Sequence, residues 1–453
     1  MKVLLINPSQ SVFSKSSVVP LGLAYLGAVL EKNNFEVKVL DMRVEKLDEK
    51  IFDWPDILGV TSATPSINHA LGISQKAKKI NPNLKIFLGG PHPSALPHEC
   101  KKDFIDGVVV GEGEQTFLET CKAVEKKKSL ANIRGLYTGK KFKPRAHIED
   151  LDSIPFPAYN LFKYPEKYGN AQPVLSNKVP CGSIITSRGC PFRCLFCFKG
   201  IYGSTFRPRS PENIIEEWRF LVDDFKVKEI AVQDDIFNFD MKRAEKIFQL
   251  LKKEKLDVPW VMPNGMKPNY LNREFLFKMK NAGCYRTAFG VESGNQHILN
   301  KMRKGTTIKM LLDAFRLCRE AKIKTMAFFI IGLPYENKET MSDTINFAKK
   351  LDPDYAQFCI AAPFPGTELY ELVRTKGRLL IGDYSKYDQM AEGKAYFEIG
   401  DVKKELVEKM YRKAYREFYL RPKVLLRFIT DKNMRHNISN SIQATSHYLG
   451  LKK

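Results

Sequence analysis

Short apolar runs alternate with amphipathic stretches over the first 140 residues. The apolar runs predict strands at residues 2–7, 36–41, 57–61, 85–88 and 107–110. Parallel strands that are buried on both faces have near-continuous apolar sequences, and helical segments between them are typical of a covered parallel sheet. Residues 1–140 therefore predict a doubly wound α/β domain of the Rossmann type. Ligands of such domains bind outside the carboxyl ends of the strands.

The same alternation returns between residues 181 and 370. It predicts strands at residues 182–186, 229–233, 259–263, 287–291, 327–331 and 357–361. Six parallel strands, each followed by a helix, predict a partial (β/α)6 barrel that is open on one side. Its active site is expected at the carboxyl ends of the strands, as in complete barrels.

Two further regions complete the predicted organisation. Residues 141–180 are rich in Pro, Tyr and Asn without a clean period, and they predict a linker. Residues 371–453 predict a basic helical C-terminal region. Five apolar residues recur there at helical spacing, which predicts a helix docked on the core; they are Val407, Met410, Tyr411, Ala414 and Phe418.

Composition indicates a large intracellular enzyme. The chain has 453 residues of which 43% are hydrophobic, enough to bury two or more cores. Its nine cysteines are an odd number and are mostly scattered, unlike a secreted disulfide framework. The N-terminus predicts a buried strand and not a signal peptide, and no apolar run approaches the roughly 20 residues of a membrane helix. We expect a cytoplasmic protein.

The net charge of +22 is partly concentrated at the C-terminal end. Residues 402–453 hold 13 Lys or Arg and 4 Asp or Glu, which gives 13 − 4 = +9. Such a surface can face an anionic membrane, an acidic substrate or a redox partner, or it can simply be solvated. No recognisable nucleic-acid-binding fold is present, so nucleic acid is not expected as a partner. The mixed basic and apolar residues 418–428 keep peripheral membrane contact open.

Three cysteines, Cys190, Cys194 and Cys197, follow the predicted strand at residues 182–186 within one short loop. Three soft thiolates suit a [4Fe-4S] cluster, and the missing fourth ligand leaves one iron open to a non-protein ligand. The alternatives are a structural cluster or a zinc site, although structural zinc normally has four protein ligands. The loop therefore favours a reactive iron–sulfur cluster.

This loop resembles the radical S-adenosylmethionine (SAM) superfamily motif, in which an aromatic residue, here Phe196, precedes the last cysteine. The resemblance implies that SAM chelates the open iron and is cleaved to a 5′-deoxyadenosyl radical, with electrons from a donor such as flavodoxin or ferredoxin. It also implies SAM contacts at later strand ends. These are Gln233, Asp234 and Asp235 for the amino group, Glu292 and Ser293 for the ribose, Gly332 and Pro334 near the adenine, and Pro363. The sequence leaves open which of the two aspartates faces inward.

Three strand-end loops of the first domain resemble the cobalamin-binding domain that precedes the radical core in one class of these enzymes. They are the segments 61–66, 88–92 and 111–114. The resemblance implies cobalamin contacts from Pro8, Ser9, Thr61, Ser62, Thr64, Gly89, Gly90, Pro91, His92, Gly111, Glu112 and Glu114.

The first domain lacks the Asp-x-His-x-x-Gly motif that supplies a histidine to cobalt in methionine-synthase-type domains. His69 and Gly72 keep the His-to-Gly spacing, but Ile67 stands in place of the aspartate. We therefore expect His69 on a helix surface and cobalamin bound without it. A domain that binds no corrinoid is the open alternative.

Together the two domains imply methylation of an unactivated carbon or, as in some relatives, phosphorus. A radical cyclase, a rearrangement enzyme and a lipid C–C bond-forming enzyme, with or without cobalamin, are alternatives within the same family. A methylthiotransferase is disfavoured because only Cys100 and Cys121 lie in the N-terminal domain. The non-enzyme alternative is an iron–sulfur electron-transfer protein. The substrate is expected to be a small molecule, a peptide or a lipid-linked compound, and no residue beyond the cofactor sites is assigned to catalysis.

Overall fold

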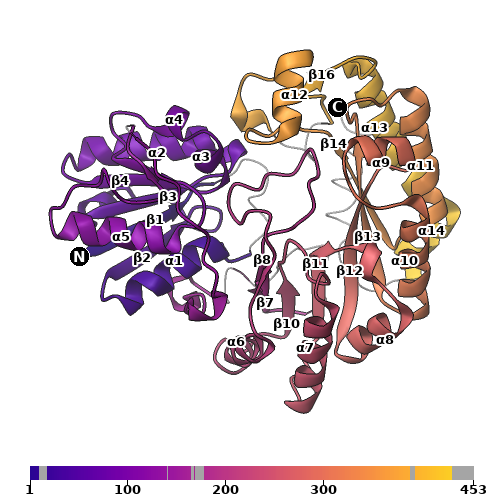
Figure 1. The fold of residues 1–453 in the computed structure, drawn as a ribbon, viewed down its shortest axis with the longest axis horizontal. Helices are drawn as coiled ribbons and strands as arrows, with labels where there is room; N and C mark the ends of the chain where they lie inside the picture. The colour runs from indigo at the N-terminus through magenta and orange to yellow at the C-terminus, as the bar shows by residue number, and fades with distance from the viewer. Residues whose placement is uncertain (10–17, 140, 165–167, 169–177, 388–392, 431–453) are drawn as a thin grey trace.

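The computed structural model describes residues 1–453 except 10–17, 140, 165–167, 169–177, 388–392 and 431–453. Two six-stranded sheets organise the chain. Figure 1 shows the N-terminal domain on one side and the larger, curved sheet with its helices on the other.

The first sheet has the order β2-β1-β3-β4-β5-β6. Its strands are β1 (Lys2–Asn7), β2 (Glu36–Asp41), β3 (Ile57–Thr61), β4 (Lys85–Gly89), β5 (Gly107–Val109) and β6 (Leu136–Tyr137). All pairs are parallel except β5 with β6. The five predicted parallel strands are confirmed, whereas the two-residue edge strand β6 is too short for a recognisable pattern.

Helices cover both faces of this sheet because its strands are apolar on both sides. Val3 and Leu5 pack in one core with α1 (Leu21–Lys32) and α5 (Glu114–Glu125). Leu4 and Ile6 pack in a second core with α2 (Ile67–Ile80). The short helices α3 (Pro91–Ala95) and α4 (Pro97–Cys100) follow β4.

The second sheet has the order β14-β13-β12-β11-β10-β7, with every pair parallel. Its strands are β7 (Cys181–Ile184), β10 (Glu229–Val232), β11 (Trp260–Met266), β12 (Cys284–Glu292), β13 (Lys324–Ile331) and β14 (Tyr355–Ile360). Since β7 and β14 are the two edges and do not pair, the barrel is partial. This confirms the predicted six-stranded open barrel.

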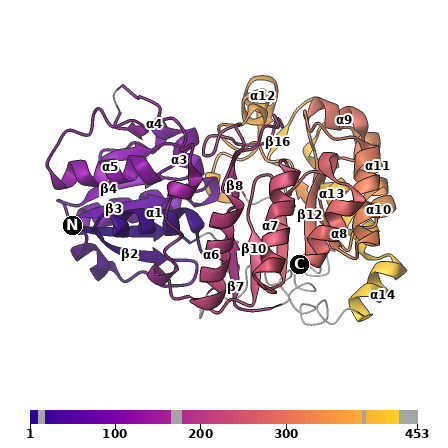
Figure 2. The same ribbon diagram turned by 60° about the horizontal axis from the view of Figure 1, so that its bottom comes forward.

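Helices cover the outer face of the second sheet (Figures 1 and 2). They are α6 (Pro211–Asp223), α7 (Met241–Lys253), α8 (Arg273–Asn281), α9 (Gln296–Lys301), α10 (Ile308–Glu320) and α11 (Lys338–Leu351). All except α8 and α9 are 13 or 14 residues long, and side-chain caps at their first turns satisfy backbone N–H groups that helices otherwise leave open.

The remaining elements connect and close the two domains. A two-stranded ribbon of β8 (Ser187–Arg188) and β9 (Arg207–Pro208) brackets the cysteine loop. The C-terminal region contains α12 (Glu368–Lys376), β15 (Arg378–Leu379), β16 (Phe397–Glu398), α13 (Lys404–Tyr419) and α14 (Pro422–Thr430). Short 3-10 segments are η1 (Glu49–Asp53), η2 (Thr64–Ser66), η3 (Leu151–Ser153), η4 (Tyr159–Leu161), η5 (Pro268–Tyr270) and η6 (Tyr384–Lys386).

Helix α13 confirms the predicted docked helix, because all five of its predicted apolar positions are buried. Part of the predicted linker lies outside the described residues, and its described part includes η3 and η4. Among the described residues no helix combines the length and apolar character needed to cross a bilayer.

Candidate cofactor and active site

The cysteine loop is held in place by the barrel. Leu195 donates its backbone N–H to the Met302 carbonyl at 3.1 Å, and its own carbonyl accepts the N–H of Leu369 at 2.9 Å. Within the loop, the Cys197 N–H donates to the Cys194 carbonyl at 3.1 Å. Backbone bonds on both sides therefore fix the loop that carries the three thiols.

The Cys197 thiol is affected by the other two thiols of the loop. Burial raises the pKa of Cys197 to about 11, and the Cys194 and Cys190 thiols add to this rise. No three His, Cys, Asp or Glu side chains in the described ranges converge tightly enough to hold a single metal ion. A cubane binds each thiolate through a different iron, so its ligands stand farther apart than those of one zinc ion. The donor set fits a [4Fe-4S] cluster better than a zinc site.

The two aspartates that follow β10 have different roles. Asp234 is 1% exposed, and its carboxylate accepts hydrogen bonds from the Thr186 N–H at 2.6 Å and from the Ser187 hydroxyl at 2.7 Å. It therefore ties β10 to the segment that enters the cysteine loop. Asp235 accepts the Gly189 N–H at 3.3 Å and lines the same cavity as Cys190.

The strand ends β10 and β12 carry the predicted contacts to the amino group and the ribose. Gln233 donates its backbone N–H to the Ile184 carbonyl at 2.8 Å. Glu292 has a φ of 64° at the end of β12, and its carboxylate pairs with Lys304 at 2.7 Å while both side chains are 10% exposed. The Ser293 hydroxyl lies 3.1 Å from the Thr344 hydroxyl. Glu292 and Ser293 are buried, Gln233 is half-buried, and all three have partners within the barrel.

The turn after β13 is built by a buried carboxylate. Glu336 Oε2 accepts the N–H groups of Gly332 at 2.8 Å and Leu333 at 2.9 Å. Burial raises the pKa of Glu336 to about 8, against the lowering effect of these two bonds. Pro334 lies in this turn, Pro363 follows β14, and Phe196 packs at the edge of the main core. No sequence motif assigns a role to Glu336, and its only signal is its position four residues after Gly332.

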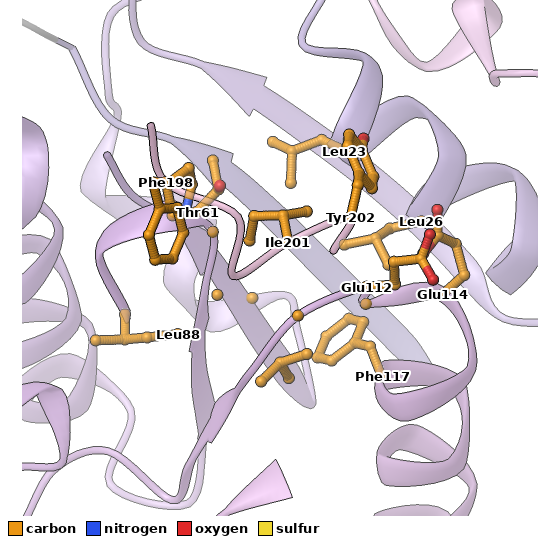
Figure 3. Close-up of a pocket in the computed structure, with 18 of the residues that line it drawn as sticks. Leu23, Leu26, Thr61, Leu88, Glu112, Glu114, Phe117, Phe198, Ile201 and Tyr202 are labelled. Atoms are coloured by element: carbon orange, nitrogen blue, oxygen red, sulfur yellow. The ribbon is translucent and has the colours of Figure 1, made fainter. Parts of the chain in front are cut away.

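A cavity of about 570 Å³ joins the two domains. Its first-domain wall contains Gly59 of β3, Leu23 and Leu26 of α1, and Phe117 of α5, whereas its barrel wall contains Cys190, Cys197 and Asp235. Figure 3 shows Phe198, Ile201 and Tyr202, from the segment after the cysteines, facing the strand ends of the first domain at Thr61 and Leu88. The cavity is therefore shared between the cysteine loop and the carboxyl edge of the first sheet.

Seven of the twelve predicted cobalamin residues line this cavity. They are Thr61, Gly89, Gly90, Pro91, Gly111, Glu112 and Glu114. Gly90 has a φ of +99°, and a Cβ there would lie 2.8 Å from the Ser62 carbonyl oxygen. Only glycine suits that close approach.

The other five predicted cobalamin residues do not line the cavity. Ser62 and Thr64 are buried, and the Ser62 hydroxyl lies 3.2 Å from that of Ser66. Ser9, which follows Pro8, contacts His69 through its hydroxyl at 3.1 Å. Side-chain direction at a strand end cannot be derived from a loop motif alone, and these residues serve the packing around the loops.

His92 packs against the C-terminal region. Its Nδ1 lies 3.2 Å from the Thr64 hydroxyl, and its ring lies 4.7 Å from that of Tyr384, centroid to centroid. Next to Tyr384, Asp383 accepts a hydrogen bond from Asn68 at 2.8 Å. The C-terminal segment thus reaches back to the strand-end loops of the first domain.

The residues present fit a corrinoid. Six glycines of the first domain line the cavity, so a flat, bulky group can approach the backbone closely; they are Gly22, Gly59, Gly89, Gly90, Gly111 and Gly113. A Cβ at Gly59 would lie 2.9 Å from Leu5 Cδ2 and 3.0 Å from Phe117 Cζ. The helix residues that line this cavity and the residues that cover it were not identified from the sequence. Ordinary core leucines and aromatics carry no recognisable motif.

Comparison with known proteins agrees with this geometry. Residues 184–348 match the radical SAM superfamily, and residues 14–120 match the B12 binding domain. The "uncharacterized methyltransferase PH0819" of Pyrococcus horikoshii is 38% identical over 448 residues, which cover 95% of each chain. The chain therefore belongs to the radical SAM superfamily, in the class with an N-terminal B12-binding domain.

Two further proteins are similar along most of the chain. The cytidylyl-2-hydroxyethylphosphonate methyltransferase of Streptomyces wedmorensis is 29% identical, covering 81% of this chain and 80% of its own. The fold resembles the radical SAM methyltransferase TsrM of Kitasatospora setae, whose structure was solved with cobalamin and a [4Fe-4S] cluster bound. The TM-score is 0.69 at 21% identity, covering 83% of this chain and 78% of that one.

Proposed function

We propose that this radical SAM enzyme uses cobalamin to methylate a carbon that carries no activating group. The observation that carries the proposal is the shared cavity, which is lined by Cys190 and Asp235 of the barrel and by Gly89 and Gly90 of the first domain. A cavity that adjoins both cofactor sites allows one substrate carbon to reach both. The methyltransferase names of the relatives support the same reaction.

The chain's own residues would hold three groups. Cys190, Cys194 and Cys197 would bind the [4Fe-4S] cluster, and the strand-end residues of the barrel would bind SAM. The cavity-lining residues of the first domain would bind cobalamin, except Glu112 and Glu114, whose carboxylates pair with arginines. When bound, the cluster and SAM supply the one-electron chemistry that removes a hydrogen atom from an unreactive carbon, and cobalamin supplies the methyl group.

The protein's part is to orient these groups and to exclude water. Carboxylates are strong acceptors for amines and sugar hydroxyls, so Asp235 would accept from the methionyl amine and Glu292 from the ribose. Asp234 would act through the loop that it anchors and not through SAM. Phe198, Ile201 and Tyr202 cover the cavity with apolar surface, which limits side reactions with water.

Surface charge indicates the kind of electron donor, and the cysteines indicate the compartment. Arg193, within the cysteine loop, is exposed, and the net charge of +22 suits an acidic electron donor such as flavodoxin or ferredoxin. All nine cysteines lie in the described part of the chain and none forms a disulfide, which suits a reducing, cytoplasmic compartment. The substrate would be a small molecule, a peptide or a lipid-linked compound that enters beside the barrel.

One experiment tests the proposal without knowledge of the substrate. The full chain is reconstituted anaerobically with iron and sulfide, loaded with hydroxocobalamin, and incubated with a low-potential reductant and SAM that carries a trideuterated methyl group. We expect 5′-deoxyadenosine and trideuterated methylcobalamin by mass spectrometry. Absence of 5′-deoxyadenosine from protein with a complete cluster would overturn the radical reaction, and failure to retain cobalamin would overturn the methyl transfer.

A further inference from the structure

Four buried charged side chains, which we name the interdomain charge cluster, join the first domain to the barrel. Glu112 lies in the loop that leads into α5 and Glu114 is the first residue of that helix, whereas Arg188 and Arg207 come from β8 and β9. Arg188 contacts Glu112 at 3.0 Å and Glu114 at 2.7 Å. Arg207 contacts Glu112 at 3.0 Å. These side chains are 3% to 9% exposed.

Each arginine of the cluster binds carboxylate oxygens through both of its terminal nitrogens, which is a specific geometry. The two terminal nitrogens of Arg188 bind one glutamate each, whereas those of Arg207 bind the two oxygens of Glu112 at 3.0 and 3.1 Å. The Arg188 guanidinium lies 5.1 Å from the ring centroid of Tyr25 and 5.0 Å from that of Tyr202. Planar arginine contacts of this kind accept only one orientation.

The charges of the cluster balance, because two carboxylates meet two guanidinium groups and all four side chains are buried. A buried charge is costly without its partner. Removing one glutamate therefore leaves an arginine that must move or draw in water.

Two members of the interdomain charge cluster line the shared cavity, and the other two lie beside its barrel wall. Glu112 and Glu114 line it directly. Arg188 stands two residues before Cys190, and Arg207 donates to the backbone carbonyl of Tyr202 at 3.0 Å. A shift within the interdomain charge cluster would therefore move the cysteine loop relative to the first-domain wall of the cavity.

We propose that the interdomain charge cluster sets the distance and the orientation of the corrinoid site relative to the iron–sulfur loop. This inference rests on the proposed function. Its four members are positioning residues, because their side-chain charges are directed at one another. The apolar contacts elsewhere between the domains supply affinity but tolerate sliding, whereas the forked ion pairs fix one register.

The test measures the distance between the two cofactors. Full-length enzyme is loaded with the cluster and cob(II)alamin, the cluster is reduced, and pulsed electron paramagnetic resonance records the distance distribution between the two paramagnetic centres. The variants are Glu114→Gln, which removes one charge, and Arg207→Lys, which keeps the charge but loses the fork. Glu114→Asp replaces Glu114→Gln if the latter does not fold.

Glu217→Gln is the matched control. Glu217 pairs with Arg209, and the two side chains are 0% and 6% exposed, so this pair is as buried as the interdomain cluster. Both of its members lie in the barrel. A general loss of stability would affect the control and the test variants alike.

We expect both test variants to keep their iron and corrinoid but to show a distance distribution at least twice as wide as that of the wild type, while Glu217→Gln stays narrow. Unchanged distributions in both variants would overturn this inference and leave the proposed function standing. Equal broadening in Glu217→Gln would also overturn it. Wild-type protein that retains no corrinoid overturns the proposed function, and this inference falls with it.

Discussion

The two sheets are built from the same strand–helix unit, but the sites at their carboxyl ends differ in kind. Apart from Glu112 and Glu114, the first-domain wall of the cavity is mainly apolar and is lined by glycine backbone and by Leu23, Leu26 and Phe117. The barrel mouth is polar, and its charged groups have fixed partners, as Glu292 has in Lys304. The first-domain site is therefore defined by the shape of an open space, whereas the barrel site is defined by charged groups and donor atoms.

The helix starts show the same contrast. The barrel helices α6, α7, α8, α10 and α11 each begin with a side chain that caps the first turn. Helices α1, α2 and α5 of the first domain have no side-chain cap, and α1 and α5 begin after Pro20 and Gly113. Helix N-termini that have a small residue or no side-chain cap leave space beside the cavity wall, but they lower helix stability.

The difference predicts opposite sensitivities. Removal of a ligand atom should abolish cofactor binding at the polar barrel mouth, because no other group replaces a lost metal ligand. Addition of side-chain atoms should weaken ligand binding at the apolar first-domain site, because that site depends on the shape of the cavity. The predictions below test this contrast in order of decreasing effect.

The largest effect is expected from Cys194→Ala. The variant lacks one of three thiolates, so we expect the cluster to be lost and 5′-deoxyadenosine formation to fall to the uncatalysed background. Iron content, absorbance and product formation after reconstitution measure this. Cys318→Ala is the control, because Cys318 is buried in α10 and should keep full iron. A fully loaded, active Cys194→Ala protein would contradict the assignment of the loop.

Gly22→Leu tests the apolar site by addition. Gly22 lies on α1 and lines the cavity, and a Cβ there meets no atom within 4 Å. A leucine should extend into the ligand space and weaken cobalamin binding about 100-fold, or about 3 kcal/mol. Equilibrium binding of hydroxocobalamin measures this.

Gly72→Leu is the matched control for Gly22→Leu. Gly72 also lies on a helix with open space around its Cβ but does not line the cavity. Both variants should resist urea at least as well as the wild type, since glycine is a poor helix former. Equal cobalamin affinity in the two variants would show that the cavity is not the corrinoid site.

Much of the fold could be predicted because the strands are apolar runs of buried residues. The bounds of β1, β2 and β3 agree with the predicted ranges, and the cysteine loop follows its predicted strand. These features depend on local sequence. A parallel sheet needs little else to be recognised.

Side-chain direction could not be predicted in the same way. Asp234 and Asp235 are adjacent, yet the partner that decides between them, Thr186, is 48 residues away. Glu112 and Glu114 follow the pattern of a cofactor loop, yet Arg188, 74 and 76 residues along the chain, binds their carboxylates. Contacts of this range depend on how the domains dock, and no local pattern contains that information.

The pH dependence of His92 provides a smaller test. His92 is 2% exposed and, unlike the ionised groups of the barrel mouth, contacts the uncharged side chains of Thr64 and Tyr384. Burial lowers its pKa from 6.5 to about 4. The unfolded chain therefore binds a proton between about pH 6.5 and pH 4 when the folded chain does not, and stability falls as the pH falls through this window.

This shift predicts a loss of about 2 kcal/mol of unfolding free energy between pH 7 and pH 5 from His92 alone. In His92→Phe, which keeps an aromatic ring beside Tyr384, the loss over the same range should be smaller by that amount. Urea unfolding at the two pH values measures both proteins. An identical pH dependence in both proteins would mean that folding does not shift the pKa of His92.

The smallest effect is expected at a charge group far from both sites. Arg421, Lys423 and Arg427, which flank or lie on α14, all contact Asp352 at 2.5 to 3.1 Å. Figure 2 shows α14 on the outside of the barrel, away from the first domain. Unlike the buried interdomain cluster, this group includes an exposed lysine, with a side chain that is 69% accessible, so water and salt screen it.

Asp352→Asn should therefore cost only about 1 kcal/mol of unfolding free energy, less at 1 M salt, with faster amide exchange confined to α14. Asparagine is suited to this position because Asp352 has a φ of 47°. Glu371→Gln, which breaks an exposed pair with Arg374, is the control and should change stability by less. A loss from Asp352→Asn as large as that from a buried ion pair would mean that α14 is part of the cooperative core. The contrast between screened surface charge and buried interdomain charge would then fail.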